Sequence, residues 1–121
     1  MDRKDEFRNR TKKYASSIIK LYCSLPKNRS EIRVLGDQML RSGTSVAANY
    51  REASRARSDA EFISRIEVCA QEADETDLWL ELLEENCEIV SELMTWLRKE
   101  TNELIAIFVT MAKNIKKRNI K

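Results

Sequence analysis

The 121-residue chain contains only two glycines, one proline and no histidine. Glycine and proline form most tight turns, so their scarcity argues against β-hairpins and favours an all-α protein. Without histidine the chain has no Ser-His or Cys-His catalytic pair and none of the commonest zinc or di-iron ligand patterns. We therefore expect a protein that is not an enzyme and that holds no cofactor and no metal.

Cysteine is also scarce, and no apolar run approaches the roughly 20 residues that a membrane-spanning helix needs. The three cysteines, Cys23, Cys69 and Cys87, are odd in number and far apart, so we expect free, mostly buried thiols rather than a disulfide framework. The N-terminal segment lacks the apolar core of a signal peptide. These absences predict a cytoplasmic protein without membrane contact.

What the chain has in abundance is charge, which accounts for 35% of its residues beside 42% hydrophobic residues. This mixture is typical of amphipathic helices, and the length predicts one domain, residues 1–121. Residues 1–57 hold 14 Lys/Arg against 6 Asp/Glu, residues 58–112 hold 3 against 14, and residues 113–121 hold 5 against none. Attraction between neighbouring antiparallel helices is one interpretation of this pattern, and a basic surface for nucleic acid is the other.

Apolar residues recur at three- and four-residue intervals in four segments, which predicts four amphipathic helices. The helices should cover about residues 4–25, 30–54, 58–86 and 91–117. Pro26 ends the first, Ser30 is expected to cap the second, and Ser58 with Glu61 forms a capping box for the third. Because the connections are short, the predicted fold is an all-α, antiparallel up-down-up-down four-helix bundle.

Two of these helices carry more apolar surface than one core stripe requires. On the third helix, Val68, Trp79 and Leu82 lie on the side opposite Ile66. The stripe of the fourth helix is widened by Trp96, Ile105, Val109 and Ala112. A single bundle would leave these side chains in water, which predicts self-association, with scattered surface aromatics as the alternative.

Polar residues follow a different face of the second helix. Arg41, Ser45, Asn49 and Glu52 fall within an arc of about 80°, opposite the apolar stripe. They therefore do not face the core of the chain, and an ordinary solvated surface is the simplest interpretation. On the apolar seam, Gly36, Gly43 and Ala47 permit a neighbouring helix to approach closely.

Two longer patterns occur in this region, R-S-x-x-S-V-x-x-N-x-x-E and E-F-I-S-x-I-E-x-x-x-x-E-A-D-E-T-x-x-W-L-E-L-L. With them, the segment from about Leu25 to Glu85 resembles a bacterial four-helix-bundle family that includes proteins encoded in intervening sequences of 23S rRNA genes. The resemblance implies a ring-like homopentamer of otherwise unassigned function. It also implies a distant likeness to the accessory protein of diversity-generating retroelements, a basic pentamer that binds nucleic acid and a reverse transcriptase.

Carried over residue by residue, the family motif occupies two helices. The motif positions are Arg41, Ser45, Asn49 and Glu52 on the second helix and Glu67, Glu72, Glu75, Thr76 and Trp79 on the third. If these polar residues avoid the core, the resemblance implies hydrogen-bonded pairs between them at subunit contacts. A metal-dependent enzyme would have only such carboxylates to work with, and no second carboxylate helix faces them, so catalysis is not expected.

Two functions remain in competition. In the first, the assembly binds RNA or DNA through clustered cations, which a ring would multiply. The candidate cations are Arg51, Arg55, Arg57, Lys113, Lys116, Lys117, Arg118 and Lys121, with Lys12 and Lys13 of the first helix in support. The absence of a known RNA-binding motif and of exposed aromatic platforms counts against this function. In the second, the protein is an interaction scaffold or accessory subunit for a nucleic-acid enzyme and presents its acidic third helix to a basic partner.

Overall fold

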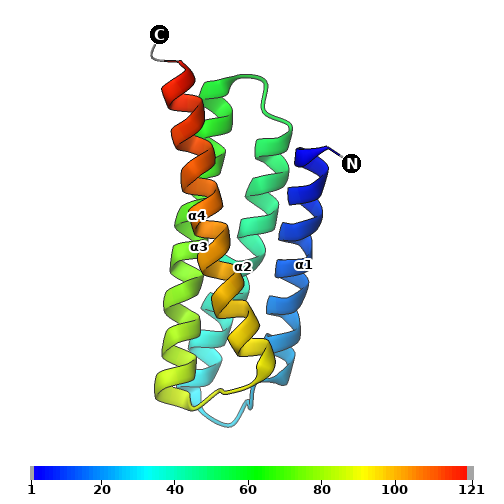
Figure 1. Ribbon diagram of the computed structural model, residues 1–121. Helices are drawn as coiled ribbons and strands as arrows, with labels where there is room; N and C mark the ends of the chain where they lie inside the picture. The colour runs from blue at the N-terminus through cyan, green and yellow to red at the C-terminus, as the bar shows by residue number, and fades with distance from the viewer. Residues whose placement is uncertain (1, 120–121) are drawn as a thin grey trace.

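The computed structural model describes residues 2–119, which form helices and connections without any strand. The four helices are α1 (Arg3–Ser24), α2 (Ser30–Ser54), α3 (Asp59–Cys87) and α4 (Glu92–Arg118). Figure 1 shows that consecutive helices join at alternating ends, so α1 begins at the end of the bundle where α4 finishes. The predicted all-α, up-down-up-down four-helix bundle is confirmed. Within the described residues, no helix is long and apolar enough to cross a membrane.

The helix ends follow the capping signals of the sequence in part. At the start of α3, Ser58 Oγ accepts a hydrogen bond from the Glu61 N–H at 3.1 Å. The Glu61 carboxylate accepts from the Arg57 N–H, also at 3.1 Å, so the return bond of the predicted capping box comes from one residue further upstream. The prediction that Ser30 caps α2 is wrong. Because α2 begins at Ser30 itself, its hydroxyl lies inside the first turn, and Arg29 occupies the cap position without a side-chain hydrogen bond.

One apolar core runs between the four helices, with the most extensive packing between α2 and α3 and the least between α1 and α4. Each helix also contributes a buried hydroxyl. Tyr14 of α1 bonds Thr101 of α4 at 2.6 Å, and Ser42 of α2 bonds Thr76 of α3 at 2.7 Å. Burial raises the pKa of Tyr14, which keeps its phenol protonated. Because buried polar groups need partners, these two bonds favour one register of the helices over its alternatives.

The cysteines are free thiols, as predicted, and two of the three are buried. Burial raises the pKa of Cys69 to about 12, so this thiol stays protonated and unreactive near neutral pH. Its Sγ donates to the Val46 carbonyl oxygen at 3.7 Å across the α2–α3 interface. Cys69 therefore serves as a small core residue.

Gly43 lets α1 and α2 approach closely. A Cβ atom at this position would lie 2.8 Å from Ile18 Cγ1 and 2.9 Å from Ile18 Cγ2. Ile18 is fully buried and β-branched, so it has little freedom to move. Gly43→Ala is expected to lower the free energy of unfolding by about 1 kcal/mol, because overpacking of about 1–3 kcal/mol exceeds the gain of about 1 kcal/mol in helix propensity.

Urea titration of both glycine variants would test this expectation. At Gly36 the close atom is Leu25 Cδ1, at 2.9 Å, the far end of a flexible side chain near the end of α1. Gly36→Ala should therefore be neutral or slightly stabilising. An equal loss of stability in the two variants would contradict the explanation from Ile18.

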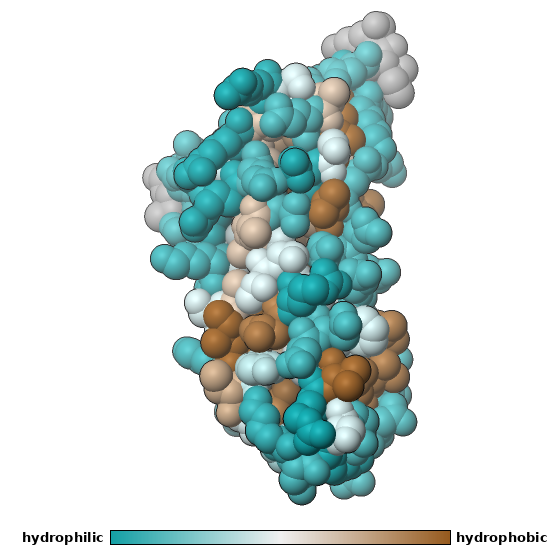
Figure 2. Space-filling view, turned by 180° about the vertical axis from the view of Figure 1, so that it is seen from behind, coloured by the Kyte–Doolittle hydropathy of each residue, from teal (hydrophilic) through white to brown (hydrophobic). Residues whose placement is uncertain are grey.

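The surplus apolar surface predicted for α3 and α4 is only partly exposed. Ala112 is buried in the core, and Trp79 and Trp96 are half-buried and pack against it, so the expectation that these residues face water is wrong. The reason is that each helix touches two neighbours, which covers a wider arc than one stripe. Among residues 2–119, the large apolar side chains that remain exposed are Ile19, Val34, Leu78, Val90 and Val109. Figure 2 shows apolar side chains concentrated in the lower half of one face of the bundle.

Candidate nucleic-acid interface

The up-and-down topology sorts charge toward opposite ends of the molecule. One end comprises the halves of the helices nearest the start of α1, residues 2–13, 43–72 and 105–119, with 14 Lys/Arg against 8 Asp/Glu. The other end, residues 14–42 and 73–104, has 7 against 12. Charge blocks that alternate along the sequence thus become a basic end and an acidic end.

Ion pairs between neighbouring helices neutralise part of this charge. Their N–O distances range from 2.7 Å to 3.8 Å. The pairs include Arg10–Glu100, Arg41–Glu72, Arg65–Glu52, Arg98–Glu84, Lys116–Glu67 and Arg118–Asp59. Attraction between adjacent helices, the first interpretation of the charge pattern, therefore accounts for these residues. The second interpretation, a basic surface for nucleic acid, concerns the cations that have no such ion pair.

Four cations line a groove between the first half of α1 and the second half of α2, which we call the α1–α2 groove. It consists of two adjoining hollows of about 440 Å³ and 530 Å³, and both are lined by Arg8, Lys12, Arg51 and Arg55. Arg8 is paired with Asp5. In the described part of the chain the other three cations have no ion pair, so their charge is available to an anion.

Small side chains keep the α1–α2 groove open. Its second hollow is lined, beside the cations, by Ala15, Ala47 and Ala48. The backbones of α1 and α2 are held close together at Gly43, so small residues on the outer sides of the two helices leave a channel rather than a ridge. Ala47, expected on the apolar seam, thus lines the groove beside Ala48 and is only partly buried.

The structure divides the predicted cations among three places. Arg51 and Arg55 lie in the α1–α2 groove, together with the supporting Lys12. Arg57 and Arg118 lie with Lys4 around a hollow of about 340 Å³ at the end of the bundle. A third pocket, between α3 and α4, is lined by Lys113, Lys116 and Lys117. Lys121 lies outside the described residues.

Two cations near the C-terminus are already paired with α3. Lys116 Nζ donates to Glu67 Oε2 at 2.7 Å, and Arg118 Nη2 lies 3.5 Å from Asp59 Oδ2. These contacts arise because the last turns of α4 run beside the acidic first half of α3. Lys13, the other supporting residue, lies over the Trp96 ring, 5.6 Å from its centroid, and so is directed toward α4.

Sequence reasoning missed Arg8 as a member of the basic surface. Arg8 and Lys12 are four residues apart, which places both on one face of α1. This four-residue spacing is the sequence signal that could have identified Arg8 as part of the basic surface. Their position beside Arg51 and Arg55 depends on the register of α1 against α2, which the sequence pattern does not give.

The polar motif residues of α2 pair with α3 inside a single chain. Arg41 Nη1 lies 3.8 Å from Glu72 Oε2, and Arg41 Nη2 lies 3.6 Å from Glu75 Oε2. Glu52 Oε2 lies 2.9 Å from Arg65 Nη1. Arg41 thus pairs with two motif carboxylates of its own chain, whereas the partner of Glu52, Arg65, is not a motif position.

Other motif residues contact their own chain as well. Ser45 Oγ donates to the Arg41 carbonyl oxygen at 2.8 Å, and Asn49 Nδ2 donates to the Ser45 carbonyl oxygen at 2.9 Å. Thr76 is fully buried, which corrects its implied place at a subunit contact. Thr76 lies on the side of α3 that faces α2, and its hydroxyl forms a hydrogen bond with the Ser42 hydroxyl.

Two polar atoms on α3 are buried without a hydrogen-bond partner among the described residues, Glu72 Oε2 and Trp79 Nε1. The Arg41 guanidinium lies too far from Glu72 Oε2 for a hydrogen bond. Burial, with the neighbouring Glu75 carboxylate, raises the pKa of Glu72. In residues 2–119 no cluster of three or more Cys, Asp or Glu side chains is arranged to hold a metal ion.

Known proteins share both the sequence pattern and the fold. The family described as 23S rRNA-intervening sequence protein matches residues 3–110. A solved structure from Bacteroides thetaiotaomicron VPI-5482, a protein with unknown function from the S23 ribosomal protein family, is similar with a TM-score of 0.79 and 35% sequence identity. The similarity covers 88% of this chain and 97% of that one. None of the curated proteins matches the chain. The chain belongs to the family of 23S rRNA-intervening sequence proteins.

Proposed function

We propose that this protein is a non-enzymatic homo-oligomer, a pentamer, that binds RNA or DNA through its basic end. The observation that carries this function is the α1–α2 groove, where cations from two helices converge and three of them have no ion pair within residues 2–119. Cations grouped in this way neutralise neighbouring phosphates and release the counterions condensed on the strand. Paired cations such as Arg41 and Arg98 would first have to leave their carboxylates.

Binding at this groove should tolerate many sequences. Its lining consists of cations, alanines, a few polar or aliphatic side chains and two carboxylates, Asp5 and Glu52, which are already paired with arginines. It has no aromatic ring on which a base could stack. Phosphate contacts position a strand without reading it, whereas specificity needs contacts to base edges. We therefore expect affinity to depend on salt far more than on base composition.

Self-association would strengthen this weak individual contact. Exposed apolar side chains such as Val34 and Leu78 lie on α2 and α3, away from the cations of the α1–α2 groove. A ring of chains with parallel helices would place every basic end on one face, so a strand that leaves one groove meets the next at high effective concentration. The acidic ends would gather on the opposite face.

The double variant Arg51→Gln/Arg55→Gln tests the groove. Both residues are exposed, so the fold should be retained. Fluorescence anisotropy with labelled polyuridylate at several salt concentrations should show weaker binding. The slope of log affinity against log salt should fall by about 1.4 for each subunit that contacts the strand, since each phosphate contact contributes about 0.7.

Lys113→Gln/Lys117→Gln is the matched control, because it removes two exposed cations from the same end of the bundle but outside the groove. It should change the salt slope much less. Equal changes in the two variants would mean that general charge, and not the groove, attracts the strand. If the unaltered protein fails to bind polyuridylate or single-stranded DNA even at low salt, the proposed function is wrong and the scaffold function takes its place.

A further inference from the structure

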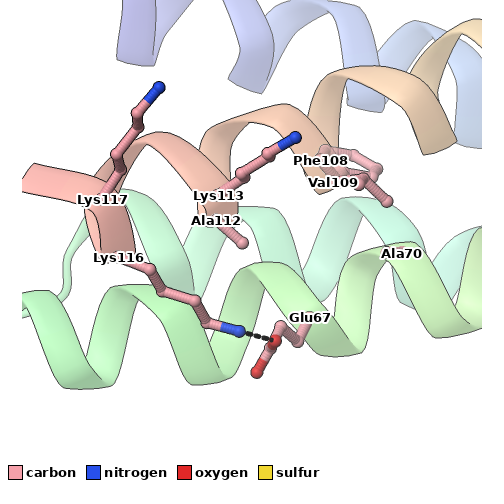
Figure 3. A pocket seen from close by; sticks show the side chains of 8 residues that line it. All are labelled: Glu67, Ala70, Phe108, Val109, Ala112, Lys113, Lys116 and Lys117. Carbon is pink, nitrogen blue, oxygen red and sulfur yellow. Dashed lines mark hydrogen bonds and ion pairs between the residues drawn. The ribbon is translucent and has the colours of Figure 1, made fainter.

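A separate pocket lies at the basic end between α3 and α4, and we call it the α3–α4 pocket (Figure 3). Its volume is about 630 Å³. The apolar floor consists of Ala70 on α3 and Phe108, Val109 and Ala112 on α4. Ala70 and Ala112 have small side chains, and this leaves space between the two helices. Val109 is 53% exposed and is the large apolar side chain that an incoming molecule would meet.

Two lysines with available charge flank this floor. Lys116 is neutralised, since its Nζ donates to Glu67 Oε2 at 2.7 Å. Figure 3 shows Lys113 and Lys117 extending away from Glu67, and neither has an ion pair within residues 2–119. They are four residues apart on α4, so their like charges lie on one face and repel each other. An anionic group placed between them would be attracted by both.

The chemistry of the floor distinguishes between possible occupants. A nucleobase gains most of its affinity by stacking on an exposed ring, but the Phe108 ring is fully buried. What is accessible is aliphatic, and an aliphatic surface best receives an apolar side chain. An amphipathic helix offers such side chains three or four residues apart and can carry carboxylates beside them, and a groove between two helices is a known docking place for a helix.

We propose that the α3–α4 pocket binds an acidic amphipathic helix of a partner protein. An apolar anchor of that helix packs on Val109, and its carboxylates meet Lys113 and Lys117. This interaction goes beyond the nucleic-acid function, because it uses α3 and α4 and none of the residues that line the α1–α2 groove. One subunit can therefore hold a strand and a protein at the same time.

The test uses the full chain and a fluorescein-labelled synthetic peptide of about 18 residues, five helical turns, with leucine on one face and glutamate beside it. Anisotropy should show binding to the unaltered protein. Val109→Asp and Lys113→Gln/Lys117→Gln should each weaken it on the order of tenfold, as expected for loss of a central anchor or its flanking charges. Ile19→Asp, a comparably exposed apolar position on α1, should bind the peptide unchanged.

Several results would overturn this inference. They are failure of the peptide to bind the unaltered protein, equal binding to Val109→Asp, and unchanged binding when the glutamates of the peptide are replaced by glutamine. Displacement of the peptide by polyuridylate would assign the pocket to nucleic acid instead, and dissociation of the Val109→Asp assembly would assign it to a second copy of the chain. Arg51→Gln/Arg55→Gln should still bind the peptide, which separates this inference from the proposed function.

Discussion

If the protein assembles as proposed, replacing both Val34 and Leu78 by glutamate is expected to leave single chains of 14.1 kDa. Val34 of α2 is 61% exposed and Leu78 of α3 is 47% exposed, so neither contributes much to the core of its own chain. If a neighbouring subunit covers them, each glutamate places an unpaired charge in an apolar contact, at a cost of several kcal/mol. In a closed ring this cost recurs at every interface, so assembly should be lost rather than weakened.

Light scattering coupled to size exclusion measures the outcome directly. The unaltered protein should have about five times the 14.1 kDa chain mass, as expected of a cyclic homo-oligomer with five copies. Val90→Glu is the matched control, because Val90 is 75% exposed in the connection between α3 and α4 and should leave assembly intact. A monomeric unaltered protein at micromolar concentration would show that the exposed apolar side chains do not mediate assembly.

Trp79 is less suited to this experiment, although its position opposite Ile66 made it an obvious interface residue in the sequence. It packs against the core from the outside, and its Nε1 is enclosed by the chain itself. A glutamate at position 79 would therefore disturb the packing of α3 against the core as well as any subunit contact. Loss of assembly would then not distinguish an interface from a damaged bundle.

The helices and their order could be predicted because several local signals agree. Apolar spacing, scarce glycine, Pro26 and the Ser58 cap all indicate the same four segments, and α1 was expected at 4–25 and lies at Arg3–Ser24. Short connections then leave only antiparallel neighbours. Agreement of this kind is characteristic of sequences that specify one fold.

The candidate site could be predicted only in part, because it depends on which residues the packed helices bring together. Arg51 and Arg55 stood out from local charge, but their neighbour Arg8 joins them through the close packing of Gly43 on Ile18. No sequence pattern indicated the pairing of Lys116 with Glu67, 49 residues away, which removes one cation from the basic surface. The sequence shows which residues are cations, whereas the register between packed helices decides which of these cations have no ion pair and can bind an anion.

The buried ion pair between α1 and α4 is the other feature that local patterns did not indicate. Glu100 lies in the polar stretch RKETNE yet is only 8% exposed, because it turns toward α1. Arg10 holds it with two bonds, Nε to Oε2 and Nη2 to Oε1, both 2.8 Å long. These hydrogen bonds raise the pKa of Arg10, so the guanidinium stays charged at any pH that the fold survives.

Arg10→Met is therefore expected to lower the free energy of unfolding by about 2–3 kcal/mol, the largest stability loss among the variants considered. Removing one partner of a buried pair leaves an uncompensated charge and costs about 3–5 kcal/mol, and the 30% exposure of Arg10 admits water that reduces this cost. The α1–α4 contact is the sparsest in the bundle, so few other interactions can compensate. Urea unfolding followed by circular dichroism gives the value.

Two further variants distinguish the effect of an unpaired buried charge on stability from the effect of lost packing. In Arg10→Met/Glu100→Met no buried charge is left unpaired, because Glu103, the other partner of Arg10, is half exposed to water. Most of the lost stability should therefore return, since well-packed apolar residues can replace a buried ion pair. Arg29→Met breaks the pair with Glu31, in which both side chains are largely exposed, and should cost less than about 1 kcal/mol. If the double variant were as unstable as Arg10→Met, the lost stability would come from the packing of the Arg10 methylenes. The unpaired Glu100 carboxylate would then not be the cause of the instability.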